Sequence, residues 1–314
     1  MSFSGDVKNQ LCQIALSKDC CALAELYGLL LFATVFSAKE IRVVTGTAKL
    51  PPRIDALGRR VLQRKGLEGL GLSRLPFEKS PAGQGKITLS LTDEPTLHGL
   101  FSLFGYEPDK QVVLHLHNWH MEEDCCRMAF LRGVFLTGGY ISDPERDYYL
   151  EITTPHRALG REFMALLGEM GFSAKQMLRR SSSVIYFKES EQIEAFLTMI
   201  GAHRAVLTLM EAKVIKDVRN HINRKVNCET ANLLRSVETG QSQAEIIRAY
   251  LDKFPLESLS PPLQEAAHLR LQYPDESLSA LAKMADPPLT KSGLNHRLTK
   301  LMKIAKEALG QSKE

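Results

Sequence analysis

The chain has 314 residues, of which 44% are hydrophobic and 24% charged, and its formal net charge is +4. This length suggests two or three domains, and the composition is ordinary for a globular protein with a substantial core. The weak net charge excludes a polycation, so any affinity for nucleic acid must come from local clusters of cations.

Neither the N-terminal segment nor the cysteines indicate an exported or metal-binding protein. The segment MSFSGDVKNQ is polar and lacks the apolar core of a signal peptide. The most apolar run, residues 26–36, is shorter than the roughly 20 residues that cross a bilayer as a helix. The cysteines have no zinc-type spacing and are interpreted as small buried hydrophobes, so we expect no metal and no other cofactor. These features predict a reduced cytoplasmic protein without membrane contact. The six cysteines are Cys12, Cys20, Cys21, Cys125, Cys126 and Cys228.

The first half of the chain contains an internal repeat. The stretch CCALAELYGLLLFATVFS at residues 20–37 recurs, altered, as CCRMAFLRGVFLTGGYIS at residues 125–142. One register without gaps aligns the cysteine pairs and also aligns Gly28 with Gly133. The chain therefore contains two copies of one unit. Each copy opens with a buried helix, and we expect the two helices to pair about a pseudo-two-fold axis.

Both copies continue with the same elements, in the order α-β-α-β-α. Strands that alternate with helices at short spacing predict an α+β fold. Breaker residues predict a loop over 72–86, and short additional strands are expected at 75–79, 110–117 and 175–180. The first copy predicts strand 40–47, helix 53–66, strand 86–92 and helix 94–105. The second predicts strand 148–155, helix 156–171, strand 182–189 and helix 191–202.

A basic segment follows the second copy. Residues 204–235 contain seven Lys or Arg and three acids, which predicts a connector with an exposed basic face. Arg219 and Arg224 are its candidate DNA contacts, and a solvated helix surface is the equally weighted alternative. The predicted domains are a first lobe (1–122), a second lobe (123–205), the connector (206–236) and a helical domain (237–314).

The helical domain has the pattern of a helix-turn-helix. A supporting helix precedes two helices that are joined by the short turn DPPLT. Ser277 and Thr290 are candidate N-caps of these two helices, and Pro287 and Pro288 end the earlier one. The helices are predicted at 241–254, 261–274, 277–285 and 291–309.

The last helix is predicted to have two distinct faces. Five Lys or Arg and no acid occur between Thr290 and Lys306. A helix in the major groove needs short polar side chains near its N-terminus and flanking cations. We expect Asn295 to contact adenine, and Arg297 and Lys300 to contact phosphate; an ordinary amphipathic surface helix is the alternative. The buried stripe comprises Leu294, Leu298, Leu301, Ala305 and Ala308. The candidate DNA-binding residues are Lys291, Ser292, Asn295, His296, Arg297, Thr299, Lys300 and Lys303, and Lys306 shares their face.

The repeat resembles the LAGLIDADG motif of homing endonucleases. LRGVFLTGG (131–139) aligns with the motif, and LYGLLLFAT (26–34) aligns in the same register. The resemblance implies that the two helices pack through Gly28 and Gly133. It also implies an acidic residue at the C-terminal end of each helix, where the pair would hold a divalent metal for phosphodiester cleavage. These positions are Ala33 and Gly138, which cannot ligate a metal, so we expect the nuclease site to be lost.

Two such motifs followed by a helix-turn-helix resemble the WhiA family of Gram-positive bacterial regulators. This resemblance implies a non-enzymatic, nucleoid-associated protein that binds double-stranded DNA at promoters or along the chromosome. It further implies transcription regulation, roles in the cell cycle, cell division and chromosome segregation, sporulation in some relatives, and other transcription or division proteins as partners. The matching segments are SFSGDVKNQL (2–11), CCRMAFLRGVFLTGGYISDPE (125–145), GAH (201–203), IKDVRNHINRKVNCETANL (215–233) and LTKSGLNHRLTKL (289–301).

Alternatives remain at several places. The lobes could form an interaction scaffold that binds a protein, with DNA binding as an anchor, or a nuclease with non-standard metal ligands. Residues 139–151 are interpreted either as a DNA or partner contact or as a connecting loop. HLHNWH (115–120) offers three histidines near two glutamates, without a fixed ligand spacing, and a strand end is the favoured interpretation. These residues are His115, His117, His120, Glu122 and Glu123.

Overall fold

The computed structural model describes residues 2–16, 18–63, 70–107 and 113–311. The chain divides into two compact units, residues 1–216 and residues 217–314. Within the described ranges, every helix is too short or too polar to cross a bilayer.

The first lobe is a four-stranded antiparallel sheet with helices. The strand order is β1-β2-β4-β3. Ser2 caps the first helix, because its hydroxyl accepts a hydrogen bond from the Gly5 N–H at 3.2 Å. The elements are α1 (Phe3–Leu11), α2 (Asp19–Leu31), β1 (Val35–Phe36), β2 (Ile41–Thr45), α3 (Leu50–Val61), β3 (Glu78–Pro81), β4 (Ile87–Leu91) and α4 (Glu94–Phe104).

The second lobe repeats this arrangement. Its strand order, β5-β6-β8-β7, matches that of the first lobe position by position, and all pairs are antiparallel. The predicted duplication and the α+β fold are thereby confirmed. The 3-10 helix η2 (Asn118–His120) precedes this lobe, whose elements are α5 (Asp124–Gly138), β5 (Gly139–Ile141), β6 (Leu150–Thr154), α6 (Arg157–Glu169), β7 (Lys175–Arg179), β8 (Ser182–Phe187) and α7 (Ser190–Ile200).

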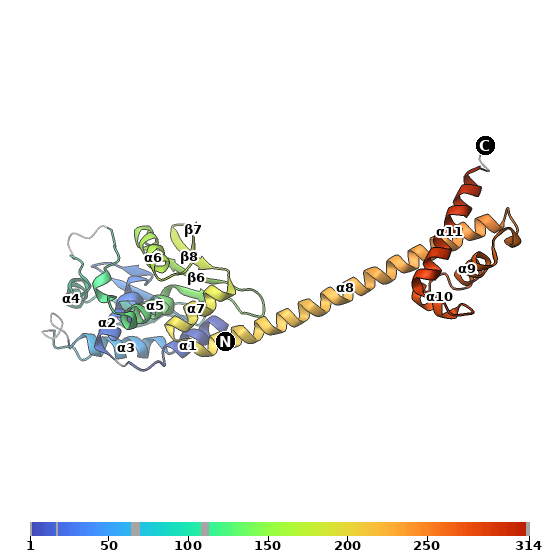
Figure 1. Cartoon of the computed structure of the whole chain (residues 1–314). Helices are drawn as coiled ribbons and strands as arrows, with labels where there is room; N and C mark the ends of the chain where they lie inside the picture. The colour runs from blue at the N-terminus through green and yellow to red at the C-terminus, as the bar shows by residue number, and fades with distance from the viewer. Residues whose placement is uncertain (1, 17, 64–69, 108–112, 312–314) are drawn as a thin grey trace. The chain divides into compact units, whose positions relative to one another are not determined.

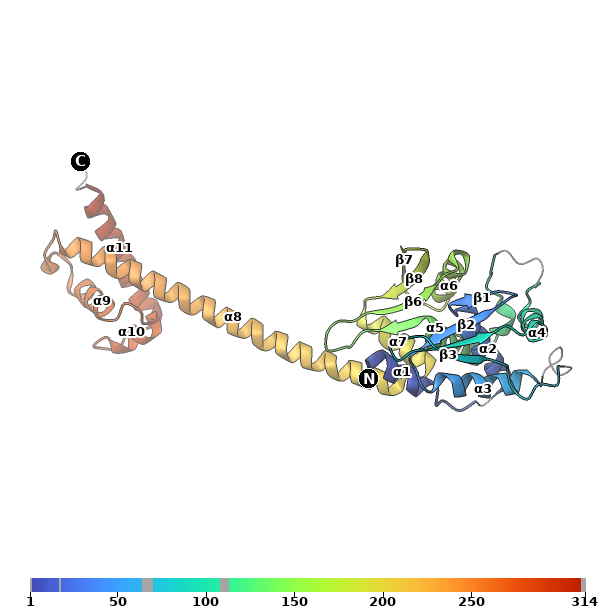
Figure 2. The same cartoon turned by 180° about the vertical axis from the view of Figure 1, so that it is seen from behind.

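The paired helices α2 and α5 form the centre of the first unit (Figures 1 and 2). Each central strand turns alternate residues toward the core, as period-two patterning requires. Ile41 and Val43 are buried on β2, and Leu150 and Ile152 on β6. The residues between them, such as Arg42 and Glu151, lie on the outer face of each sheet.

Several boundaries differ from those predicted. The end of each repeat forms a short strand, β1 or β5, rather than more helix. α3 begins at Leu50, because prolines suit the first helical turn; the predicted end of this helix, 64–66, lies outside the described residues. The strand expected at 75–79 lies at 78–81 instead, since Leu75 is buried against Gly58. The strand at 175–180 is confirmed as β7, while 113–117 are not a strand and 110–112 lie outside the described residues.

The second unit is helical, as predicted. The connector and the helix expected at 241–254 belong to one continuous helix, α8 (His203–Leu251), which begins in the first unit. Sequence reasoning missed this continuity because Gly240 looks like a break. A Cβ at Gly240 would overlap the carbonyl oxygen of Pro274, so this glycine lets the segment after α9 pack closely against α8. The other elements are the 3-10 helix η3 (Leu256–Ser258), α9 (Pro261–Gln272), α10 (Leu278–Met284) and α11 (Lys291–Gln311).

Candidate nucleic-acid interface

The helices α2 and α5 touch backbone to backbone at their glycines. A Cβ at Gly133 would overlap the carbonyl oxygen of Glu25, and a Cβ at Gly28 would overlap that of Phe130. Both glycines are therefore required by close approach rather than by backbone conformation.

The ends of these helices do not fit a divalent metal. Ala33 is 1% exposed and offers no ligand atom. A Cβ at Gly138 would lie 2.7 Å from the carbonyl oxygen of Thr153, so this position has no room for a carboxylate. Asp143, Glu145 and Asp147 come after β5, and no three acids or histidines of the described chain converge as metal ligands there. Hard cations need such oxygen ligands, so the residues present do not support the nuclease chemistry of the motif.

A buried ion network lies where the two helices cross. Glu25 is fully buried, and its carboxylate accepts two hydrogen bonds of 2.7 Å from Arg53 of α3. Arg132 of α5 adds a third, at 3.0 Å, and also donates to the carbonyl oxygen of Ile200. Arg53 further donates to the carbonyl oxygen of Ile14. One carboxylate thus joins both lobes, and its burial makes the network costly to break.

The histidine segment joins the lobes through separate contacts. His115 Nδ1 lies 2.6 Å from Glu162 of α6, whose other oxygen accepts the Leu116 N–H. The His117 N–H donates to the Tyr27 hydroxyl at 3.0 Å, and the His120 ring packs on Tyr27. Glu122 and Glu123 are exposed. Each histidine has its own neighbours, which favours the structural interpretation over a shared metal.

In the second unit, both predicted N-caps are confirmed. The Ser277 hydroxyl accepts the Ala280 N–H at 3.2 Å, and the Thr290 hydroxyl accepts the Gly293 N–H at 3.1 Å. The Leu289 N–H donates to the Ala282 carbonyl at 2.8 Å, which holds the turn between α10 and α11. Capping and this hydrogen bond together fix where α11 begins.

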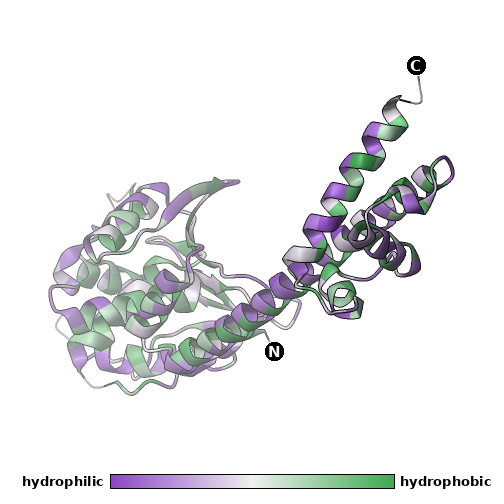
Figure 3. Cartoon of the chain, turned by 45° about the vertical axis from the view of Figure 1, so that its right-hand side comes forward, coloured by the Kyte–Doolittle hydropathy of each residue, from purple (hydrophilic) through white to green (hydrophobic). Residues whose placement is uncertain are grey.

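The two faces of α11 separate as the sequence predicts. Leu294, Leu298, Leu301 and Ala305 are each 0% exposed, and Ala308 is partly buried. Figure 3 shows apolar and polar residues alternating along this helix. The exposed positions include Lys291, Ser292, Asn295, His296, Thr299, Lys300, Lys303 and Lys306.

Arg297 differs from the other candidates. Its guanidinium donates to Glu265 of α9 at 2.7 Å, and both side chains are about 70% buried, with 27% and 30% exposed. The other oxygen of Glu265 accepts the Asp286 N–H in the turn at 3.0 Å. Arg297 thus ties α11 to α9 and to the turn, which is a positioning contact.

The connector residues Arg219 and Arg224 are exposed on α8, as is every residue from 217 to 235. The apolar Val218, Ile222 and Val226 are also more than half exposed. The segment is therefore a mixed surface, with cations and apolar side chains interleaved, rather than a purely basic face.

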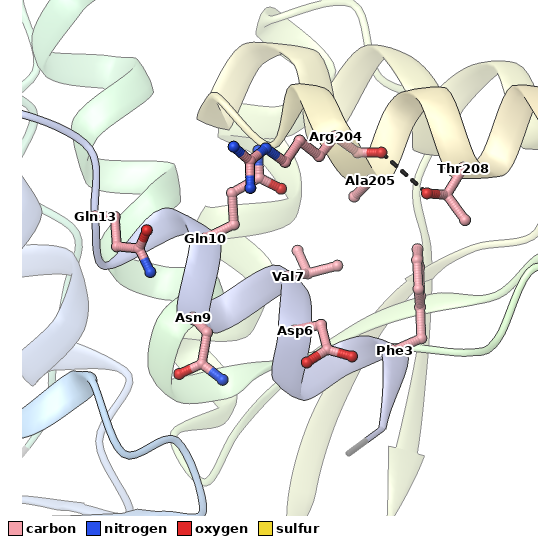
Figure 4. A pocket seen from close by; sticks show the side chains of 9 residues that line it. All are labelled: Phe3, Asp6, Val7, Asn9, Gln10, Gln13, Arg204, Ala205 and Thr208. Carbon is pink, nitrogen blue, oxygen red and sulfur yellow. Dashed lines mark hydrogen bonds between the residues drawn. The ribbon is translucent and has the colours of Figure 1, made fainter.

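Two open clefts lie among the described residues of the first unit. One, of about 330 Å³, lies between α1 and the start of α8, where Asp6 and Arg204 are its charged lining residues (Figure 4). The Thr208 hydroxyl donates to the Arg204 carbonyl at 3.1 Å at its edge. The other cleft, of about 570 Å³, lies beside β5 and is lined by Asp143, Arg146 and Asp147 among others. Neither lining carries the excess of cations that phosphates need.

Two LAGLIDADG-type lobes without their acidic residues, followed by a helix-turn-helix, define the class: a LAGLIDADG-like protein with a C-terminal helix-turn-helix domain. The family model of the WhiA LAGLIDADG-like domain matches residues 127–219, and that of the WhiA C-terminal HTH domain matches residues 222–305. The chain belongs to the WhiA family.

Curated relatives match over the whole chain. A "Probable cell division protein WhiA" of Ruminiclostridium cellulolyticum is 38% identical over 312 residues, covering 97% of each chain. That of Carboxydothermus hydrogenoformans is 36% identical over 310 residues, covering 98% of each. The crystal structure of full-length DUF199/WhiA from Thermatoga maritima has the same fold, with a TM-score of 0.54, 22% identity and coverage of 98% and 99%.

Sequence reasoning missed two groups of residues in the first unit. One is the Glu25 network, whose partners are far apart in the chain. The other is the set of four repeat cysteines, whose Sγ atoms all lie within 4.8 Å of one another. The signal for the second was present, because equivalent positions of two paired helices must meet near their common axis.

Proposed function

We propose that this protein is a non-enzymatic, sequence-preferring DNA-binding regulator that acts at the nucleoid in the cytoplasm. The observation that carries the proposal is the division of α11 into a fully buried apolar stripe and an exposed face that holds no acid from Lys291 to Lys306. The names of its curated relatives support a role in cell division. We extend this role to transcription, chromosome segregation and, in some relatives, sporulation.

In this proposal, Ser292, Asn295, His296 and Thr299 contact base edges in the major groove, since they follow the capped N-terminus of α11. Lys291, Lys300 and Lys303 contact phosphates, and Arg219 and Arg224 add phosphate contacts from α8. Arg297 positions α11 through Glu265. The lobes, 1–122 and 123–205, serve as a platform, and the connector 206–236 leads to the helix-turn-helix domain, 237–314.

The test compares two double variants of the full chain on a duplex identified by genome-wide mapping of bound sites. Asn295→Ala with His296→Ala should reduce the preference for that duplex over a scrambled one by tenfold or more, since each good base contact discriminates by about 1–3 kcal/mol. Lys300→Ala with Lys303→Ala should weaken binding to both duplexes alike. Fluorescence anisotropy at several salt concentrations measures both effects. Unchanged preference in the first variant would overturn the assignment of α11.

The non-enzymatic part has its own test. Plasmid incubated with the protein and Mg²⁺ or Mn²⁺ should remain supercoiled, because positions 33 and 138 supply no carboxylate for a metal. Cleavage that survives stringent purification and is lost with Asp143→Asn or Asp147→Asn would establish a nuclease with non-standard ligands.

One observation favours a second function, in which the lobes bind a protein partner while α11 binds DNA. Arg42 pairs with Glu40 at 2.6 Å, and Arg179 pairs with Glu151 at 2.9 Å, so these two outer-face arginines already have carboxylate partners. The cleft beside β5 likewise has two aspartates for one arginine. Such surfaces suit a protein partner better than phosphates. Arg42→Glu and Arg179→Glu should leave DNA affinity unchanged if the lobes bind protein, and should weaken it if they bind DNA.

A further inference from the structure

The four cysteines of the repeat lie together at the N-terminal ends of the paired helices. Cys20 and Cys21 are the second and third residues of α2, and Cys125 and Cys126 are the second and third residues of α5. Their Sγ atoms all lie within 4.8 Å of one another, and all four thiols are free. Within the described ranges, no other set of three or more histidines, cysteines or acids converges in this way.

We propose that Cys20, Cys21, Cys125 and Cys126 form a tetrathiolate site for one zinc ion that joins the two lobes. A Zn–S bond is about 2.3 Å long, so two sulfurs of one tetrahedral zinc lie about 3.8 Å apart and never more than about 4.6 Å. The observed upper limit of 4.8 Å requires shifts of no more than about 1 Å, which side-chain rotation supplies. Four soft thiolates in a tetrahedron select zinc over hard cations such as Mg²⁺.

The surroundings suit the negative charge of such a site. Four thiolates and one Zn²⁺ carry a net charge of −2, and the positive ends of the dipoles of α2 and α5 both lie at the cluster. Lys18 adds a cation, with its Nζ 3.9 Å from Cys125 Sγ. Cys126 is buried and the other three cysteines are partly buried, so water has limited access.

The protonation of the thiols makes zinc binding depend on pH. A hydrogen bond from the Cys21 thiol lowers the pKa of Cys125, which favours the thiolate form that zinc binds. Burial raises the pKa of Cys21 to about 11 and also raises the pKa of Cys126. Zinc binds thiolates, so its binding releases protons from these thiols and the affinity rises with pH.

The site is structural, because four protein ligands leave no coordination position open for a substrate. It links residues that are more than 100 positions apart in the chain, and such a cross-link removes much of the freedom of the unfolded state. It lies at the opposite ends of α2 and α5 from Ala33 and Gly138, so it is distinct from the lost nuclease centre. It is also independent of the proposed DNA binding by α11.

The test uses the full chain, reduced with a phosphine and stripped of metal with a chelator. Titration with Co²⁺ should give the intense visible bands and near-ultraviolet charge-transfer absorption of a tetrahedral thiolate complex, and Zn²⁺ should displace it. Zinc added in excess should remain at one ion per chain after gel filtration, as measured by elemental analysis. Zinc should also protect the four cysteines from a thiol reagent, while the exposed Cys228 stays reactive.

Substitution of single cysteines distinguishes zinc binding at this site from zinc binding by any exposed thiol. Cys20→Ser and Cys125→Ser should each weaken zinc binding at least tenfold, whereas Cys228→Ser, which changes an exposed cysteine of α8, should leave it unchanged. The proposal is overturned if the reduced wild-type chain binds no stoichiometric zinc, if its Co²⁺ spectrum is that of weak octahedral coordination, or if the four cysteines form disulfides under reducing conditions. The wild-type measurements decide the question even if a serine variant fails to fold.

Discussion

The paired helices α2 and α5 differ from α11 in how much surface they leave free. Ten of the 13 residues of α2 are buried, and eight of the 15 residues of α5. In α11, a helix of 21 residues, full burial is confined to one stripe of four, Leu294, Leu298, Leu301 and Ala305. A helix that is buried on all sides can present side chains to a ligand only at its ends, whereas α11 presents a continuous strip.

This difference indicates which residues of each unit are accessible to a ligand. The C-terminal ends of α2 and α5, where the nuclease motif carries its acids, hold Ala33 and Gly138. Their N-terminal ends hold four thiols. In the middle of the pair, Gly28 and Gly133 allow the two helices to pack closely, and Glu25 binds two arginines. Substitutions in the middle should therefore act on stability, and substitutions on the face of α11 should act on binding.

The largest effect is expected at Gly133. A Val side chain there would overlap the backbone of α2 at Glu25, which cannot move aside as a flexible side chain can. Gly133→Val should therefore prevent the first unit from folding. The fluorescence of Trp119, the single tryptophan of the chain, reports on this unit during urea unfolding. Gly168→Ala is the matched control in α6, where an added Cβ meets nothing within 4 Å, and it should stabilise by about 0.5–1 kcal/mol. Equal midpoints for the two variants would contradict the close-packing argument.

The next largest effect is expected at Glu25. Glu25→Gln leaves Arg53 and Arg132 buried without their carboxylate, and breaking such a pair costs about 3–5 kcal/mol of unfolding free energy. Glu40→Gln removes a similar bidentate partner from Arg42, whose side chain is 43% exposed, and should cost less than about 1 kcal/mol. Urea midpoints of both variants give the comparison. A Glu25 variant as stable as the Glu40 variant would show that the network contributes nothing beyond a surface pair.

The fold was largely predictable because its signals are local. Alternation located β2, β4, β6 and β8, and the caps at Ser277 and Thr290 fixed the starts of α10 and α11. The one-register repeat gave the duplicated order of elements. The short strands β1 and β5 were not predictable, since two or three residues form a strand only when a neighbouring strand supplies hydrogen bonds.

The sites were less predictable because their partners are far apart in the sequence. Glu25 finds Arg53 and Arg132 only after α2, α3 and α5 have packed, and no periodicity links these three positions. The helical wheel predicts that Arg297 contacts phosphate, but in the structure its guanidinium forms an ion pair with Glu265 on α9. The cysteines were interpreted one helix at a time as buried hydrophobes, although the pairing of the two helices brings all four together.

A smaller effect, with a defined pH window, is expected at Lys8 of α1. Burial lowers the pKa of Lys8 to about 8, from an ordinary value of 10.5. Between these two pH values the unfolded chain binds more protons than the folded chain, so this group makes stability rise with pH across that window. Its full contribution is up to about 3 kcal/mol. The thiols with raised pKa values, such as the partly buried Cys12 with its pKa raised to about 12 by burial, act in the opposite direction.

Lys8→Met removes the contribution of the lysine. The variant should be more stable than the wild type at pH 7, and its advantage should shrink as pH rises from 8 to 10.5. Urea unfolding at several pH values measures this difference, with both proteins carrying Cys12→Ala because the Cys12 thiol interacts electrostatically with Lys8. An advantage that does not change with pH would show that the Lys8 ammonium is not destabilised by burial.

The smallest effects are expected on α11, where they also separate positioning from contact. Arg297→Met removes the ion pair with Glu265 and should cost about 1–2 kcal/mol of stability in the second unit. It should leave the salt dependence of DNA binding unchanged, because Arg297 already has a protein partner. Lys300→Ala should leave stability unchanged and lower the slope of log affinity against log salt by about 1. Helix melting by circular dichroism and anisotropy titrations measure the two quantities. If Arg297→Met instead lowers the salt slope, its guanidinium must leave Glu265 for phosphate when DNA binds, and α11 then has one more contact residue than its exposed face suggests.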